Sequence, residues 1–177
     1  MAIREFKGKK PKIHSTAFIS ESCYIVGDVE IGENSSVWPG AVIRGDYGTI
    51  IIGKNTVVQD NCVLHTDDSL HIGDNVQITH SAVIHGGRIG NNVMIGTNST
   101  VLESVKIGQF CFIGANALVL ANTVVPDNSL VIGVPGKIKT LQEQHRRKLE
   151  NPTAKYVLNA REFRDEGLDD PSTVKFM

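Results

Sequence analysis

The chain has 177 residues, which is enough for one domain with a full hydrophobic core. Its formal net charge of −1 excludes the strongly basic surface typical of nucleic-acid-binding proteins. No apolar run reaches the length needed to span a membrane, and the first residues lack the apolar segment and cleavage site of a secretion signal. Three cysteines, an odd number without metal-binding spacing, argue against a disulfide framework, so we expect a cytoplasmic protein.

Residues 1–12 form a polar lead-in, and from Ile13 onward an aliphatic residue recurs at every sixth position. The period holds for twenty hexads out of twenty, with changes of length only within 43–51, 64–71 and 84–88. The fifth position is small or β-branched almost throughout and includes all three cysteines, which we interpret as core residues. The aliphatic first positions are Ile13, Ile19, Ile25, Ile31, Val37, Ile43, Ile52, Val58, Leu64, Ile72, Ile78, Ile84, Ile89, Ile95, Val101, Ile107, Ile113, Val119, Val125 and Val131.

This repeat resembles the hexapeptide-repeat proteins, and a fixed internal period predicts the fold more firmly than any single element does. The resemblance implies an all-β fold, a left-handed parallel β-helix of hexapeptide repeats with a triangular cross-section, followed by a C-terminal α-helical extension. Three hexads make one coil, so twenty hexads give between six and seven coils. We expect the β-helix domain to occupy residues 1–136, with coils from about residue 13, and the extension 137–177 to pack on the same domain.

The second residue of each hexad points outward, and sorting these residues by face gives vertical columns. The third face carries Val26, Arg44, His65, His85, Leu102 and Leu120. His65 and His85 are therefore predicted to be direct neighbours at the strand spacing of about 4.8 Å, with Arg44 one coil before them. Every change in repeat length falls at the corner directly after this face, where loops that carry function collect.

Helices are predicted beyond Pro135, which ends the last coil. Thr140 and Glu143 have the spacing of a capping box for a first helix. Asn151 and Pro152 supply an N-cap and a first-turn proline for a second helix.

The single tryptophan, Trp38, occupies an outward position on the second face. Large aromatic residues are enriched at interfaces, so we expect Trp38 to be buried against a neighbouring chain, with cover by the chain's own C-terminal helix as the alternative.

Three histidines within this repeat have the chemistry of a transition-metal site, because three neutral imidazoles leave one coordination position open. His80 lies at a third position on the second face, with Asp60 beside it one coil earlier, and cannot readily join His65 and His85 of its own chain. A neighbouring copy can present its second face to the third face of the first, and repetition of this contact closes a three-fold ring. The geometry thus predicts a homotrimer whose metal sites each combine His65 and His85 of one chain with His80 of another.

The polar motifs in this register resemble the γ-class carbonic anhydrase family. They are Arg44-Gly-Asp46, Gln59-Asp60, His65, His80 and His85-Gly86, and the resemblance covers nearly the whole chain. It implies a homotrimer, zinc with Fe²⁺ or Co²⁺ as alternatives, and the reversible hydration of carbon dioxide to bicarbonate. It also implies a salt bridge between Arg44 and Asp60 across the interface and a role for Gln59 in orienting the metal-bound water or substrate. Tyr156 matches a tyrosine that approaches the site in shorter family members, and packing within its helix is the alternative.

The residue types suit this chemistry. Three neutral histidines leave the metal doubly positive, which lowers the pKa of its bound water to about 7 in carbonic anhydrases, and the resulting hydroxide attacks carbon dioxide. Gln59 can hydrogen-bond the hydroxide without titrating, while Arg44 and Asp46 hold charge and orientation around the ligands.

Two departures from the family pattern bear on turnover. Val57 replaces an asparagine that hydrogen-bonds the glutamine, and the loop 66–70 is shorter than the acidic loop of the best-studied active form.

Three other functions stay open. A hexapeptide acyltransferase needs one histidine as a general base and no metal triad, so the three histidines count against it. A metal-dependent acyl-thioester hydrolase would use the same hydroxide on another carbonyl group. A structural trimer would use the metal only to join its subunits.

Overall fold

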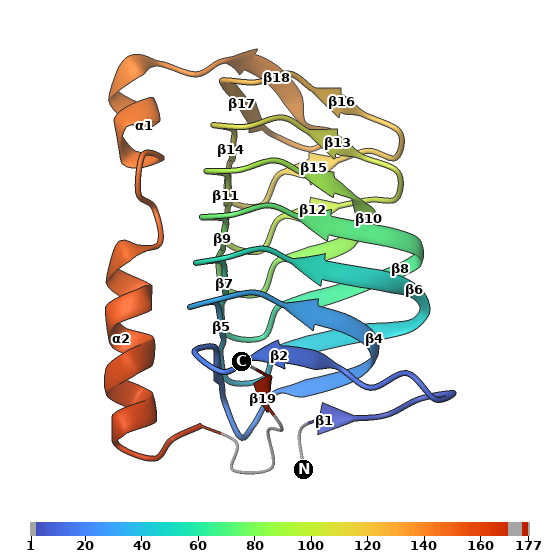
Figure 1. The fold of residues 1–177 in the computed structure, drawn as a ribbon. Coiled ribbons are helices and arrows are strands. Elements are labelled where there is room, and N and C mark those ends of the chain that lie inside the picture. The colour runs from blue at the N-terminus through green and yellow to red at the C-terminus, as the bar shows by residue number, and fades with distance from the viewer. Residues whose placement is uncertain (1–2, 170–174, 177) are drawn as a thin grey trace.

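The structure, a computed structural model, describes residues 3–169 and the backbone of residues 175 and 176. The chain forms a left-handed parallel β-helix of about seven turns, with two short helices lying along one side of it (Figure 1). The predicted fold class is therefore confirmed. No helix in the described part of the chain is long and apolar enough to cross a membrane.

The coils are carried by two sheets. The larger, eleven-stranded sheet wraps around one corner, because its longest strands continue from the third face onto the first. Its strands are β1 (Ile3–Arg4), β2 (Lys12–His14), β4 (Tyr24–Ile31), β6 (Val42–Ile52), β8 (Val63–Ile72), β10 (Val83–Ile89), β12 (Thr100–Val101), β13 (Lys106–Ile107), β15 (Leu118–Val119), β16 (Val124–Val125) and β19 (Lys175–Phe176).

The eight-stranded sheet forms the second face. It consists of β3 (Phe18–Ile19), β5 (Ser36–Val37), β7 (Val57–Val58), β9 (Gln77–Ile78), β11 (Met94–Ile95), β14 (Phe112–Ile113), β17 (Ser129–Ile132) and β18 (Lys137–Thr140). β18 is antiparallel to β17 and closes the last coil as a hairpin. Helices α1 (Glu143–Lys148) and α2 (Ala154–Asp165) then run back along this sheet (Figure 1).

The core is a stack of equivalent residues. Ile25 pairs with Ile43, and Ile43 pairs with Leu64, so each first-position aliphatic side chain lies on its equivalent one coil away. These side chains and the small fifth positions, including all three cysteines, form one buried cluster. Each Å² of apolar surface removed from water contributes about 25 cal/mol to the stability of the β-helix. This contribution is spread along the whole stack, and no single contact dominates it. Register between coils is thereby set, and with it the positions of the outward columns.

Both helices begin later than their capping patterns predict. Thr140 is paired with Ser129 in the β17–β18 hairpin, so the chain is still a strand there, and α1 starts after Gln142. α2 starts after Thr153 rather than after Asn151. Neither helix has a side-chain capping hydrogen bond, and both predicted caps are wrong.

Trp38 is buried by its own chain. Its indole packs between Phe18, Phe163 and Tyr156, with ring centroids 5.0–5.8 Å away, and only 7% of the residue is exposed. The expected burial of Trp38 against a neighbouring chain is therefore wrong, because α2 lies over β3 and β5 and covers this part of the second face.

This packing predicts the fluorescence of Trp38. Its emission should be blue-shifted in the assembled protein and should stay so when the assembly dissociates on dilution, since α2 remains in place. Emission and sedimentation would be recorded over the same dilution series. A red shift that follows dissociation without loss of secondary structure would contradict the burial by α2.

The corners of the prism depend on asparagine. Nine asparagines adopt positive φ values of 51–60°, a region that asparagine tolerates better than other residues with a Cβ. Asn122 is exposed, with φ of 60°, and its backbone N–H donates to the carbonyl of Glu103 at 3.0 Å.

Asn122→Ala should therefore lower the free energy of unfolding by about 1 kcal/mol, and Asn122→Gly by less. Asn159→Ala makes the same chemical change inside α2, where alanine favours the helix, and should cause no loss. Urea unfolding at one fixed protein concentration measures all three. Equal midpoints for Asn122→Ala and wild type would show that the corner exerts no such constraint.

Candidate metal centre

The third face carries the predicted histidine pair. His65 on β8 and His85 on β10 are register partners, and their ring centroids lie 5.2 Å apart. Arg44 on β6 is the register partner of His65 one coil earlier. The predicted vertical column is therefore observed, and its order follows from the six-residue period.

Asp46 links the pair to Arg44. Its Oδ1 lies 3.1 Å from Nε2 of His65, and its Oδ2 lies 3.5 Å from the guanidinium of Arg44. With a proton on Nε2, His65 donates a hydrogen bond to the carboxylate, which fixes the plane of the ring and leaves Nδ1 as the electron-pair donor. Asp46 is mostly buried, so this contact is screened from solvent. Such a carboxylate–histidine pair is the usual support of a metal ligand.

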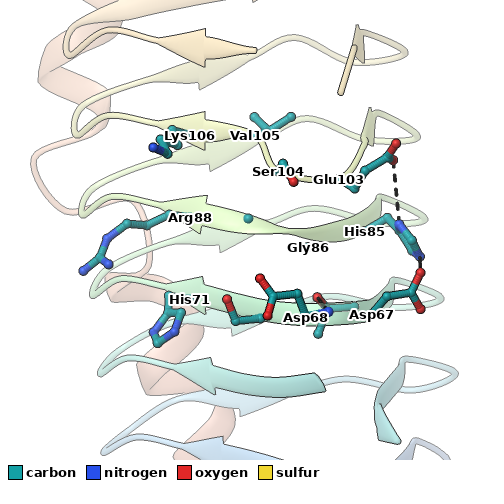
Figure 2. Close-up of a pocket in the computed structure, with 13 residues that line it drawn as sticks. Asp67, Asp68, His71, His85, Gly86, Arg88, Glu103, Ser104, Val105 and Lys106 are labelled. Carbon is teal, nitrogen blue, oxygen red and sulfur yellow. Dashed lines mark hydrogen bonds and ion pairs between the residues drawn. The ribbon is translucent and has the colours of Figure 1, made fainter. Parts of the chain in front are cut away.

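Two acidic residues flank His85. Oδ2 of Asp67 is 4.0 Å from Nε2 of His85, and Oε2 of Glu103 is 3.9 Å from its Nδ1 (Figure 2). The candidate ligand atoms of His65, Asp67 and His85 all lie within 4.8 Å of one another. The sequence analysis did not identify Asp67 or Glu103 as site residues. Asp67 could have been found from its place in the lengthened corner loop two residues after His65.

His80 lies in the turn that follows β9 of the other sheet, two residues after Ile78. Its Nδ1 is 2.9 Å from Oδ2 of Asp60, the same kind of support that Asp46 gives His65, and this leaves Nε2 of His80 without that partner. His80 is 51% exposed. It is not part of the His65, Asp67 and His85 group, so one chain brings together two of the three predicted histidine ligands.

Gln59 is a deeply buried polar residue that directly precedes Asp60. It is 1% exposed, and its Nε2 has no hydrogen-bond partner among the residues that the structure describes. Unpaired buried amides are rare, so this group calls for a partner outside the described chain. The position fits an amide that contacts a bound species, and it comes directly before Asp60 in the sequence.

Two aromatic residues take different positions. Tyr156 packs edge-on against Trp38 beneath α2, with ring centroids 5.8 Å apart, which is the helix-packing alternative for this residue. Tyr47, in the insertion that follows Arg44, is 74% exposed and lies 6.2 Å from the ring of His65. The sequence analysis missed Tyr47 because this residue lies in an insertion within β6, outside the six-residue period.

The donor set fits a divalent transition metal. Imidazole nitrogens supported by carboxylates suit zinc, iron or cobalt, and one acidic oxygen lies close enough to complete or exchange with the set. All three cysteines lie in the buried core, and none belongs to the group of candidate ligands in the described part of the chain. Burial also raises the pKa of the Cys62 thiol to about 11 and raises the pKa of Cys111. Histidine is therefore the principal ligand type.

The contact between Asp46 and His65 predicts the effect of a conservative change. Asp46→Asn should weaken metal binding about 10- to 100-fold, since the amide no longer enforces the orientation and basicity of the ring. Asp68→Asn removes an equal charge from an exposed carboxylate in the same corner loop and should change affinity little. Competition with a chromophoric chelator for Co²⁺ measures both. Equal affinities of wild type and Asp46→Asn would rule out this support.

Comparison with known proteins shows which proteins the chain is similar to. The family described as "Bacterial transferase hexapeptide (six repeats)" matches residues 10–45 and 86–121. A "Probable carbonic anhydrase" of Methanocaldococcus jannaschii is 54% identical over 142 residues, which cover 78% of this chain and 89% of that protein. A "Carbonic anhydrase" of Geobacillus kaustophilus is 38% identical over 158 residues, which cover 88% and 87%.

A similar solved structure is that of a putative acetyltransferase from Bacillus cereus. It has a TM-score of 0.89 and 38% sequence identity, and the match covers 93% of this chain and 97% of that one. The identity and the extent of the matches to the two carbonic anhydrases place the chain in their family. The chain belongs to the γ-class carbonic anhydrase-like family of hexapeptide-repeat proteins.

Proposed function

We propose that the chain is a metal-dependent carbonic anhydrase that reversibly hydrates carbon dioxide at sites shared between the subunits of a homotrimer. One observation carries the proposal: each chain holds two separate half-sites, each with a histidine supported by a carboxylate. His65 with Asp46 lies on the eleven-stranded sheet, and His80 with Asp60 lies in the turns that follow β9 and β7 of the other sheet. The relatives named carbonic anhydrase support the same activity.

The surface beside the first half-site suits a partner subunit. Tyr24, Val42, Val63 and Val83 are register neighbours in one column of the third face, and none of them is buried. Tyr24 is 42% exposed and Val83 is 38% exposed. An exposed apolar column of this kind, next to polar ligands, is typical of a surface that becomes buried when two copies of a chain associate.

The other half-site limits how the partner approaches. Helix α2 covers the second face at Trp38. In this proposal the neighbouring chain therefore contacts the corner after the second face, where Asp60 and His80 lie, and not that whole face. This head-to-tail contact closes after three copies. Arg44, which pairs with Asp46 within the chain, then lies toward Asp60 of the neighbour, as the family resemblance implies.

In this proposal His65 and His85 of one chain and His80 of the next hold a zinc ion, with Fe²⁺ or Co²⁺ as alternatives. The metal supplies Lewis-acid activation of water for attack on carbon dioxide. Asp46 and Asp60 keep the rings of His65 and His80 in fixed orientations. Gln59 supplies a buried amide that hydrogen-bonds the reacting species without changing its own charge.

Proton removal falls to the carboxylates around His85. Asp67 is exposed at the site and lies 4.0 Å from Nε2 of His85, so it can accept a proton at the site and release it to solvent. Glu103, on the opposite side of the same ring, is the second candidate. We propose that these groups take the role of the longer acidic loop that the chain lacks, and that Tyr156 acts in packing against Trp38.

Acyl transfer and thioester hydrolysis are the competing functions. The Bacillus cereus structure is described as a putative acetyltransferase, and a metal site of this kind also suits hydrolysis of a thioester carbonyl. Stopped-flow carbon dioxide hydration, acetyl-coenzyme A thioesterase and acetyl-transfer assays on one metal-quantified preparation would separate them. Rapid thioester hydrolysis without carbon dioxide hydration would replace the present proposal with the hydrolase.

Shared sites predict complementation between inactive variants. In randomly mixed trimers of His65→Ala and His80→Ala chains, each mixed trimer contains one site with all three histidines, so about a quarter of all sites should recover metal and activity. Mixing His65→Ala with His85→Ala restores no site and is the matched control. Metal content, hydration rate and subunit exchange by native mass spectrometry are measured together. Mixed trimers that bind no more metal than their parents would refute the intersubunit site.

A further inference from the structure

The metal centre opens into a groove that carbon dioxide does not need. A depression of about 500 Å³ runs around the corner after the third face, between segment 66–69 of β8 and the following coils. Figure 2 shows His85, Asp67 and Glu103 at one end of it, and His71, Arg88 and Lys106 at the other. The groove therefore joins the candidate metal ligands to a group of nitrogen-bearing side chains on the first face.

The far end of the groove is a ladder of cationic and N–H-donating groups. Arg88 is the register partner of His71 on one side and of Lys106 on the other, so the three side chains lie on consecutive coils. Arg88 and Lys106 are exposed, and among the residues that the structure describes neither forms a salt bridge. Like charges in direct register repel each other, and an anion bound between them would relieve that repulsion.

The acidic residues of the same groove do not neutralise the ladder. Asp67 and Glu103 lie at the opposite end, beside His85, and Asp68, the third acidic residue of the lining, lies between the two ends (Figure 2). In the part of the chain that the structure describes, none of the three forms a salt bridge with Arg88 or Lys106. The groove thus has positively charged side chains at one end, and candidate metal-ligating and carboxylate side chains at the other. That polarity suits an elongated molecule with an anionic head and a second functional group, and not a small linear gas.

The floor of the groove is built from backbone. The repeat is one residue short at 84–88, and Gly86 and Gly87 occupy the bend with φ values of 85° and 102°. A Cβ on Gly87 would meet the carbonyl oxygen of Val105, so the adjacent coils approach closely there. Without side chains at these two positions, the path from His85 to Arg88 stays open across about three residues, or about 10 Å of extended chain.

We propose that this groove binds a short organic oxyanion, a phosphate monoester or a carboxylate, with its anionic group on the His71–Arg88–Lys106 ladder and its other end directed toward His85. The guanidinium of Arg88 provides paired N–H donors, and the ammonium of Lys106 adds a charge one coil away. Binding to the ladder does not depend on carbon dioxide hydration, so the two proposals can fail separately.

Titration calorimetry on the zinc-loaded trimer would test the site with two probes of the same body, phenyl phosphate and benzoate. The double variant Arg88→Gln/Lys106→Gln should weaken binding of the preferred probe by about ten-fold or more, because charge-assisted hydrogen bonds are lost. Arg88→Lys with Lys106 intact should retain part of the affinity. Stronger binding of phenyl phosphate assigns a phosphate ligand, and stronger binding of benzoate assigns a carboxylate.

The matched control is Lys137→Gln/Lys139→Gln, which removes the same charge from exposed lysines at the other end of the prism. This control should bind the probe as wild type does. Equal weakening in both double variants would mean that only overall charge is sensed and would overturn the proposal. Loss of binding after zinc removal from a trimer that stays assembled would also overturn it, since the anion would then be on the metal.

A third result would show that Arg88 and Lys106 stabilise the trimer and do not bind an anion. If wild type binds neither probe and Arg88→Gln/Lys106→Gln lowers the stability of the trimer, the cations pair with carboxylates of a neighbouring subunit, and the anion site does not exist. Absence of carbon dioxide hydration with intact probe binding would contradict the proposed function and leave the groove assignment standing.

Discussion

Register between coils is the constraint on which the rest of the structure depends. A side chain at one position of a hexad lies one strand spacing from its equivalent in the next coil, and the buried aliphatic stack holds this alignment along the whole prism. Once the core is stacked, the register also fixes which outward side chains are neighbours. His65 therefore meets His85, and Arg88 meets both His71 and Lys106, although the core residues that align them contribute nothing to the chemistry.

The same rigidity explains why a single chain carries only part of a metal centre. A parallel β-helix can place ligands above one another on a face, but it cannot bend one face toward the next, because every turn is set by the stack inside it. His80 and Asp60 are fixed in the turns after β9 and β7 of one sheet, while His65, His85 and Asp46 are fixed on the other sheet. A fold of this kind gains a three-dimensional ligand set by bringing two copies together and needs no long loop to do so.

The fold was predicted from the resemblance of the repeat to hexapeptide-repeat proteins. Given that fold, the six-residue period was enough to predict the core and the histidine column, because both are local consequences of the period. It failed where contacts between distant segments decide. The start of α1 depends on Thr140 being held in a hairpin with Ser129, and the burial of Trp38 depends on where α2 returns to the β-helix. The roles of Asp67 and Glu103 beside His85 depend on the path of a corner loop and on the next coil, neither of which the period specifies.

The hairpin of β17 and β18 also decides how the molecule ends. A parallel β-helix finishes in a coil whose unpaired N–H and C=O groups match those of any other copy, and such open edges template end-to-end filaments. Here β18 turns back antiparallel across β17, and it presents Lys137 and Lys139 at the edge of the sheet. Charge at an exposed edge discourages the addition of another strand. A β-helix could in principle extend without limit by end-to-end association. The four residues of β18 oppose this and so give the molecule a defined length.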